Sequence, residues 1–191
     1  MIGWAEFNVA RKTEYKGKRI LIKLHIGGKI PKDGWTILDI QAASYVDLVG
    51  SCMNMPFLED GSVDQIYASH VFEHLGHREE LFGALSECHR VLRTDGKLMM
   101  SVPDLRKLAA LFVSSDISLN QRYEIMLSLF GGQLSPHDFH KSGLFEELLV
   151  KYLNSTNFSN TEIVEEFDLF EDSSKLRING QVISLNVIAT K

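Results

Sequence analysis

Cysteine is scarce in this sequence, and no apolar segment is long. Only Cys52 and Cys88 occur among 191 residues, and their separation rules out a CxxC metal or redox motif. This excludes a zinc knuckle and a disulfide framework, and it predicts two buried free thiols. No apolar run approaches the ~18 residues that a membrane-spanning helix needs, so we expect no membrane partner.

A basic run and a signal peptide are also missing. The net charge is −5 and the Lys and Arg residues are scattered, so we expect no nucleic-acid partner. The N-terminal residues MIGWAEFNVARKTEYKGKR are charged at every few positions and lack the apolar core of a signal peptide. We therefore expect a cytoplasmic protein with a single domain over residues 1–191, of which residues 1–18 form an N-terminal extension.

Strand and helix patterns alternate along most of the chain. Apolar alternation predicts strands over residues 19–26, 35–40, 45–49, 63–69 and 97–102. Helical periodicity predicts helices over about 79–93, 103–113, 120–131 and 142–157, with Pro103 opening the second and Asn120 and Ser142 as N-caps. Two further strands, 161–170 and 182–190, follow without a helix between them, which predicts an antiparallel pair with a long loop. The order indicates an α/β domain.

The connection between the first two predicted strands is short. Residues 27–34 read GGKIPKDG, and about eight residues are fewer than the dozen that a parallel crossover usually takes. Any helix in this connection must therefore be very short.

Glycines and polar residues stand at the ends of the predicted strands: Gly27 and Gly28, Asp39, Ser51, and Ser69 with His70. In an open parallel sheet, ligands bind beyond the carboxyl ends of the strands. A carboxylate at the end of the second strand could accept hydrogen bonds from both hydroxyls of a ribose. Asp39 could equally end a strand without binding anything.

Several segments together resemble class I S-adenosylmethionine-dependent methyltransferases of the small, type 11-like group. They read KLHIGG, GWTILD, MPFLEDGSVDQIYASHVFEHL, RVLRTDGKLMMSVPDL, DFHKSG and ISLNVIATK. The resemblance implies a three-layer Rossmann-like α/β fold with a seven-stranded, mostly parallel sheet whose last strand is antiparallel. It also implies S-adenosyl-L-methionine as the cofactor and a small-molecule or carbohydrate-related methyl acceptor.

The resemblance further assigns parts of the cofactor site. Gly27 and Gly28 would lie near its methionine end, Asp39 at its ribose, residues 51–53 along its adenine, and residues 69–70 beside its sulfonium. The full implied set is His25, Gly27, Gly28, Lys29, Asp39, Ser51, Cys52, Met53, Ser69 and His70.

Three of these residues depart from the family pattern, and they favour an alternative. The family has an acidic residue or Asn where this chain has His25, a glycine where it has Lys29, and an Asp where it has Ser51. Lys29 could fill the pocket or pair with the carboxylate of the cofactor, and Ser51 keeps a hydroxyl but lacks the charge. The alternative is a methyltransferase-fold protein that has lost catalysis and serves as a binding or regulatory module.

Methyl transfer depends mainly on positioning the acceptor, with a base where the acceptor carries a proton. The candidate bases are His70, His74, His137 and His140, because imidazole titrates near neutral pH; we take His70, His74 and His140 as the catalytic candidates. Each could instead be a histidine that satisfies backbone groups.

Two short motifs suggest metal ligands. HVFEH at 70–74 has the spacing of the zinc-protease HxxEH motif, but His70 follows directly on a strand and should lie off the helix face. HDFH at 137–140 could supply a pair of ligands, but the sequence indicates no third one nearby. We therefore expect no metal and interpret residues 114–141 as a lid-like insertion over the substrate.

Overall fold

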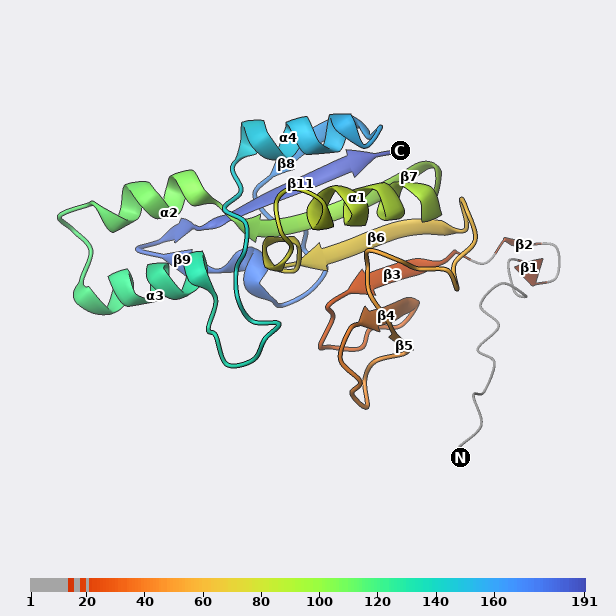
Figure 1. The fold of residues 1–191 in the computed structure, drawn as a ribbon, viewed down its shortest axis with the longest axis horizontal. Helices are drawn as coiled ribbons and strands as arrows, with labels where there is room; N and C mark the ends of the chain where they lie inside the picture. The colour runs from red at the N-terminus through yellow and green to blue at the C-terminus, as the bar shows by residue number, and fades with distance from the viewer. Residues whose placement is uncertain (1–13, 16–17, 20) are drawn as a thin grey trace.

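The computed structural model describes residues 14–15, 18–19 and 21–191, and a seven-stranded sheet in the order β5-β4-β3-β6-β7-β11-β8 forms its centre (Figure 1). The strands β3 to β7 run parallel, whereas β11 lies antiparallel between β7 and β8. This confirms the predicted fold class, including the antiparallel last strand. The strands are β3 (Lys23–Ile26), β4 (Trp35–Asp39), β5 (Leu48–Val49), β6 (Val63–Ser69), β7 (Leu92–Pro103), β8 (Ser159–Val164) and β11 (Ser184–Thr190).

Four α-helices accompany this sheet in the described part of the chain (Figure 1). α1 (Glu80–Val91) and α4 (Glu146–Ser155) cover one face, and α2 (Leu105–Phe112) packs against α3 (Leu119–Phe130) at one end. None of the helices among the described residues combines the length and apolar character that a membrane crossing requires. The short elements are β1 (Glu14–Tyr15), β2 (Lys18–Arg19), β9 (Arg177–Ile178), β10 (Gln181–Val182) and the 3-10 turns η2 (Phe72–His74) and η3 (Ser173–Lys175).

Several predicted boundaries are wrong. α3 is capped by Ser118, whose hydroxyl accepts from the Gln121 N–H, and not by Asn120. α4 begins after Phe145, and Ser142 instead donates to the Leu75 carbonyl. The helix expected to open at Pro103, α2, starts after residue 104. Most of the predicted N-terminal extension, residues 1–18, and residue 20 of the first predicted strand lie outside the described residues.

The connection between β3 and β4 contains no helix, as its length predicts. Gly27 adopts a φ of +70° and donates its N–H to the Leu38 carbonyl at 2.8 Å. The positive φ turns the chain at the end of β3, and the bond ties this turn to β4.

Alternation along the central strands divides their side chains between two faces of the sheet. Leu24 and Ile26 of β3, with Ile66 and Ala68 of β6, pack in the core under α1 and α4. Cys52 and Cys88 belong to the same core as buried free thiols, which confirms the prediction from their spacing.

The opposite face is covered by residues 165–183, which connect β8 to β11. Phe167 and Phe170 of this connection pack on Trp35 and Tyr67. His25 is buried among these rings, with its centroid 4.2 Å from that of Phe170 and 5.1 Å from that of Tyr67. Its neighbours are aromatic, and this face of the sheet is therefore held together by ring packing.

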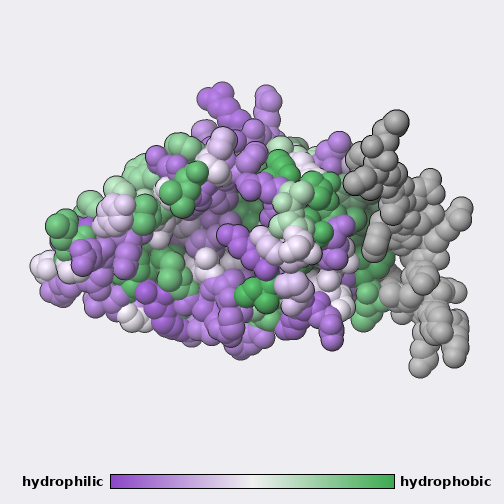
Figure 2. All heavy atoms as spheres, turned by 90° about the horizontal axis from the view of Figure 1, so that it is seen from below, coloured by the Kyte–Doolittle hydropathy of each residue, from purple (hydrophilic) through white to green (hydrophobic). Residues whose placement is uncertain are grey.

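Helices α2 and α3 form a smaller core at one end of the molecule. Leu108 and Ile125 face Ile178 and Ile183 there. The outer side of this pair leaves Leu119 exposed, and Figure 2 shows apolar spheres at this end among polar ones. The chain leaves α3 toward the carboxyl ends of the central strands.

Burial makes His25 a source of acid sensitivity. Among the described residues its Nδ1 has no hydrogen-bond partner, and burial lowers its pKa from 6.5 to about 4 against the opposing charge of Asp172. Between those pH values the unfolded chain binds a proton at this residue that the folded chain does not. The contribution of His25 to the free energy of unfolding is therefore fully present above about pH 6.5 and is lost as the pH falls toward 4.

We predict that His25→Leu reduces this acid sensitivity. Wild-type unfolding free energy should fall by up to about 3 kcal/mol from this residue between pH 6.5 and pH 4. In the variant the corresponding part of the slope should vanish, because leucine fills a similar volume without a proton site. Urea unfolding at several pH values measures both slopes, and equal slopes would contradict the prediction.

Candidate functional site

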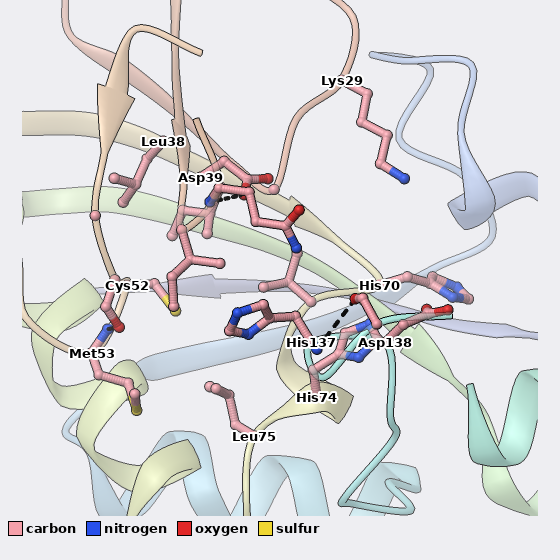
Figure 3. A pocket seen from close by; sticks show the side chains of 18 of the residues that line it. Lys29, Leu38, Asp39, Cys52, Met53, His70, His74, Leu75, His137 and Asp138 are labelled. Carbon is pink, nitrogen blue, oxygen red and sulfur yellow. Dashed lines mark hydrogen bonds between the residues drawn. The ribbon is translucent and has the colours of Figure 1, made fainter. Parts of the chain in front are cut away.

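A cavity of about 670 Å³ opens at the carboxyl ends of β3, β4, β5 and β6 (Figure 3). Its size is that of sites for ligands as large as a nucleoside derivative. Asp39, Cys52 and Met53 line one side, and His70 and His74 face them from the other. The cavity therefore lies where an open parallel sheet binds its ligands.

Gly27 lets two strand ends approach closely at the floor of the cavity. A Cβ built on Gly27 would lie 2.5 Å from the Val71 Cγ2, and the positive φ of +70° disfavours a side chain as well. Only glycine therefore permits the backbone after β3 to meet the turn after β6 at this distance.

Asp39 ends β4 with its carboxylate at the cavity. Its Oδ1 accepts a hydrogen bond from the Gln41 N–H at 2.7 Å (Figure 3). Because a carboxylate offers about four acceptor positions, this bond leaves capacity for the two hydroxyls of a ribose.

Residues 51–53 follow β5 along the same side. The Ser51 hydroxyl accepts from the Met53 N–H at 3.2 Å, which fixes the turn and still leaves the hydroxyl proton to donate. Burial raises the pKa of Cys52 to about 11, so this thiol contributes apolar surface and no thiolate. Lys29 is exposed and also lines the cavity, on the opposite side of the view from Cys52 and Met53 (Figure 3).

The structure brings together seven of the ten residues that the sequence assigns to the cofactor. His25, Gly28 and Ser69 stay outside the cavity lining. The residues along the cavity are Gly27, Lys29, Asp39, Ser51, Cys52, Met53 and His70.

Strand alternation explains two of the three residues that do not line it, and a close contact explains the third. His25 and Ser69 point to the aromatic face, where Ser69 donates to Asp172 at 3.0 Å. Gly28 leaves room for the His25 ring, because a Cβ on Gly28 would lie 2.6 Å from the His25 Nδ1. These residues belong to the packing of the opposite face.

His70 begins a cluster of titratable groups at one end of the cavity. It follows β6 with a φ of 54°, and its Nε2 lies 2.9 Å from the Ser184 hydroxyl. Its Nδ1 lies 3.4 Å from Oε1 of Glu73. As expected, His70 lies before η2 and outside the helical geometry of a zinc protease.

Glu73 belongs to this cluster, although the sequence did not indicate it as a functional residue. It is 1% exposed, and burial raises its pKa to about 8. His74 and His140 stand beside it, with ring centroids 4.6 Å apart. The position of Glu73 inside the HVFEH motif could have indicated a functional residue, but nothing in the sequence indicates that it lies near His140.

Burial also keeps the imidazoles of the cluster uncharged. It lowers the pKa of His70 to about 4, helped by the proximity of His140. It lowers the pKa of His74 and of His140 as well. The histidines are therefore neutral at physiological pH and able to accept a proton or a metal.

The loop after α3 borders the cavity from the side of the predicted lid. Ser135 to Asp138 and Lys141 line it, whereas His140 lies behind His74. Lys141 pairs with Glu80 of α1 at 3.1 Å. The backbone N–H groups of Lys141 and Ser142 donate to the Glu73 carbonyl at 2.8 and 3.0 Å, which fixes the end of the loop on η2.

Comparisons with known proteins agree with this geometry. A family model described as a methyltransferase domain matches residues 36–100, which is about a third of the chain. No curated protein sequence matches. The matched region runs from β4 into β7 and includes Asp39, residues 51–53 and the HVFEH segment.

Solved structures share the fold. A SAM-dependent methyltransferase from Archaeoglobus fulgidus superposes with a TM-score of 0.56 at 18% identity, covering 90% of this chain and 86% of that one. The CMeT domain of the citrinin polyketide synthase gives 0.55 at 15% identity, covering 90% and 46%. The structure of PigF with SAH gives 0.51 at 13% identity, covering 90% and 56%.

At these identities the likeness establishes the fold. Together with the family match it confirms the resemblance to class I S-adenosylmethionine-dependent methyltransferases. The two findings support a methyltransferase and S-adenosylmethionine as its cofactor.

The close approach at Gly27 generates a prediction with a matched control. Gly27→Ala and Gly34→Ala both place an alanine at positive φ, but a Cβ on Gly34 meets nothing within 4 Å. We expect Gly34→Ala to cost about 1 kcal/mol of stability and Gly27→Ala about 2–4 kcal/mol, because Val71 must also shift. Urea unfolding measures both, and equal losses would show that the contact with Val71 adds nothing.

Proposed function

We propose that this chain, with its methyltransferase-domain match on a class I methyltransferase fold, transfers methyl groups from S-adenosylmethionine to a small-molecule or carbohydrate-related acceptor. The observation that carries the proposal is the cavity of about 670 Å³ at the carboxyl ends of β3 to β6, lined by Asp39 and residues 51–53 of the matched region. A cofactor of nucleoside size would occupy much of this volume, so the space supports a small acceptor.

The lining residues fit the parts of the cofactor. Asp39 has acceptor capacity for the ribose hydroxyls. Residues 51–53 offer a hydroxyl and apolar surface for the adenine, and Gly27 leaves room for the methionine end. Lys29 at the cavity supplies a positive charge for the cofactor's carboxylate.

The departures from the family pattern weigh less against cofactor binding than the sequence suggested. His25 packs among aromatic rings on the opposite face, so its substitution does not alter the cavity lining. Ser51 keeps a hydroxyl at the cavity. The inactive alternative thus loses His25 as support.

In this reaction the chain would position the acceptor and accept its proton. When bound, S-adenosylmethionine supplies a sulfonium methyl: the C–S bond breaks with its electron pair left on sulfur, and a bond from the acceptor to carbon forms. His70 and His74 border the cavity, with His140 behind His74. We propose this end for the acceptor and its departing proton, because neutral imidazoles gather there.

Asp39→Ala tests the cofactor site. Wild type with S-adenosylhomocysteine at ~100 times its dissociation constant should gain about 2.7 kcal/mol, which raises its melting midpoint by about 5–10 °C. Losing the carboxylate should weaken binding by about 10- to 100-fold. Thermal shift and calorimetric titration measure the effect.

Asp33→Ala is the matched control, since Asp33 lies in the preceding connection and outside the cavity lining. It should bind like wild type. If millimolar S-adenosylhomocysteine shifts neither wild type nor control, the cofactor proposal fails and the binding-module alternative takes its place.

Lys29→Met tests the role of this lysine. We expect S-adenosylhomocysteine to bind about 2- to 5-fold more weakly, the size of an exposed ion pair. Binding of 5′-methylthioadenosine should stay the same, because this ligand lacks the carboxylate. Tighter binding of both ligands would instead mean that Lys29 obstructs the cavity.

A further inference from the structure

We propose that Glu73, His74 and His140 form a binding site for a divalent transition-metal ion, with Zn²⁺ as the best chemical match. One ligand atom from each of the three lies within 4.8 Å of those of the other two. The site joins HVFEH and HDFH, two motifs that each lack a full set of ligands in the sequence.

The carboxylate of Glu73 lacks partners. No described residue makes a hydrogen bond to either of its oxygens, and Glu73 is 1% exposed. Burying a polar group without a hydrogen bond, or a charge without a counter-charge, costs several kcal/mol. A cation at the carboxylate would remove this cost.

Hydrogen bonds to backbone carbonyls determine which ring nitrogens of two histidines carry protons. The His140 Nδ1 lies 2.9 Å from the Ser128 carbonyl, and the His74 Nδ1 lies 3.2 Å from the Phe139 carbonyl. A carbonyl oxygen only accepts, so each Nδ1 is the donor and each Nε2 keeps its lone pair. The His140 Nε2 lies 3.9 Å from the Glu73 Oε1.

His70 adds a further unprotonated nitrogen. The Ser184 hydroxyl donates to the Ser173 carbonyl at 2.9 Å, so it accepts from the His70 Nε2. The Nδ1 that lies 3.4 Å from Glu73 is therefore the acceptor nitrogen. The carboxylate thus faces ring nitrogens that accept hydrogen bonds. One proton could join a single nitrogen to a single carboxylate oxygen, whereas a cation could bind several of these atoms at once.

The surroundings orient the ligands as metal sites do. Metal-binding histidines usually donate their second ring N–H to a carbonyl or carboxylate, and the bonds to Ser128 and Phe139 are of this kind. The N–H groups of Lys141 and Ser142, which hold the Glu73 carbonyl, fix His140 next to η2.

The ligand set selects the class of ion. Two imidazoles and one carboxylate are a set that catalytic zinc sites use with a fourth position open; Mg²⁺ prefers oxygen ligands and keeps its water. Zinc bonds of ~2.0–2.1 Å place ligand atoms about 3.3 Å apart, so ligand atoms that now lie up to 4.8 Å apart need to approach by up to about 1.5 Å. His74 lines the cavity, and the open position would face it.

The use of such an ion rests on the proposed function, but its binding does not. An ion at the cavity end would lower the pKa of an acceptor hydroxyl beside the cofactor. The rival explanation is that Glu73 is a protonated carboxylic acid with a structural role only. That rival predicts no metal binding.

Calorimetric titration of the tag-free, EDTA-dialysed protein separates the two. We expect wild type to bind one Zn²⁺ per chain and no Mg²⁺ at matched concentrations. Glu73→Gln and His140→Ala should weaken Zn²⁺ binding by at least about 10- to 100-fold, the loss that even outer-shell changes produce. His137→Ala is the matched control: it lies in the same loop and lines the cavity but is outside the cluster, and it should bind Zn²⁺ like wild type.

The proposal is overturned if wild type binds no Zn²⁺, if the variants bind it as wild type does, or if Mg²⁺ is preferred. Glu73→Gln keeps the side-chain size, so its metal-free form should melt no lower than wild type, and only Zn²⁺-dependent stabilisation should disappear. S-adenosylhomocysteine is titrated into the same metal-free preparations. If the protein binds Zn²⁺ but not S-adenosylhomocysteine, the proposed function is refuted and the metal site stands. If it binds S-adenosylhomocysteine but not Zn²⁺, the metal site is refuted and the proposed function stands.

Discussion

The connection of β3 to β4 over residues 27–34, without a helix, determines how one whole face of the sheet is covered. In the strand order β4-β3-β6-β7, the crossover from β3 to β4 runs in the opposite direction to the one from β6 to β7. Right-handed crossovers in opposite directions place their helices on opposite faces. α1 follows β6 and occupies its face, so the short connection leaves the other face without its helix.

The long connection between β8 and β11 supplies the missing layer. Phe167 and Phe170 pack where a crossover helix would lie, and their rings meet Trp35, Tyr67 and His25. A charged side chain would be costly among these rings, so a neutral histidine suits this position better than the acidic residue that the family resemblance implies. A departure in the cofactor motif thus follows from packing on the far face.

Sequence patterns predicted the fold and the edge of the sheet at which the site lies. β6 has the predicted bounds because a buried run ends there at Ser69 and His70. Helix caps were less predictable, because Ser118 and Asn120 both favour an N-cap and only the fold selects one. Alternation separates His25 from Leu24 and Ile26, but it does not say which face carries the cavity, because both faces of these strands are buried.

The sequence also predicts one part of the site and not the other. Gly27, Asp39 and residues 51–53 follow from strand ends, so parallel topology alone brings them to one cavity. Glu73 and His140 meet because the loop after α3 returns to η2 and is held there by backbone bonds. No local pattern encodes such a return.

His25 and Glu73 are both buried and titratable, but their surroundings differ. His25 is surrounded by rings and remains neutral, so packing accounts for it without a ligand. Glu73 faces the unprotonated ring nitrogens of three histidines. The N–H groups of these rings already donate to Ser128, Phe139 and Ser184. Neutral packing explains the first residue, but it leaves the second without a donor. A cation beside the cavity is therefore the simplest way to satisfy Glu73, and it would connect the loop, η2 and the acceptor end of the cavity in one site.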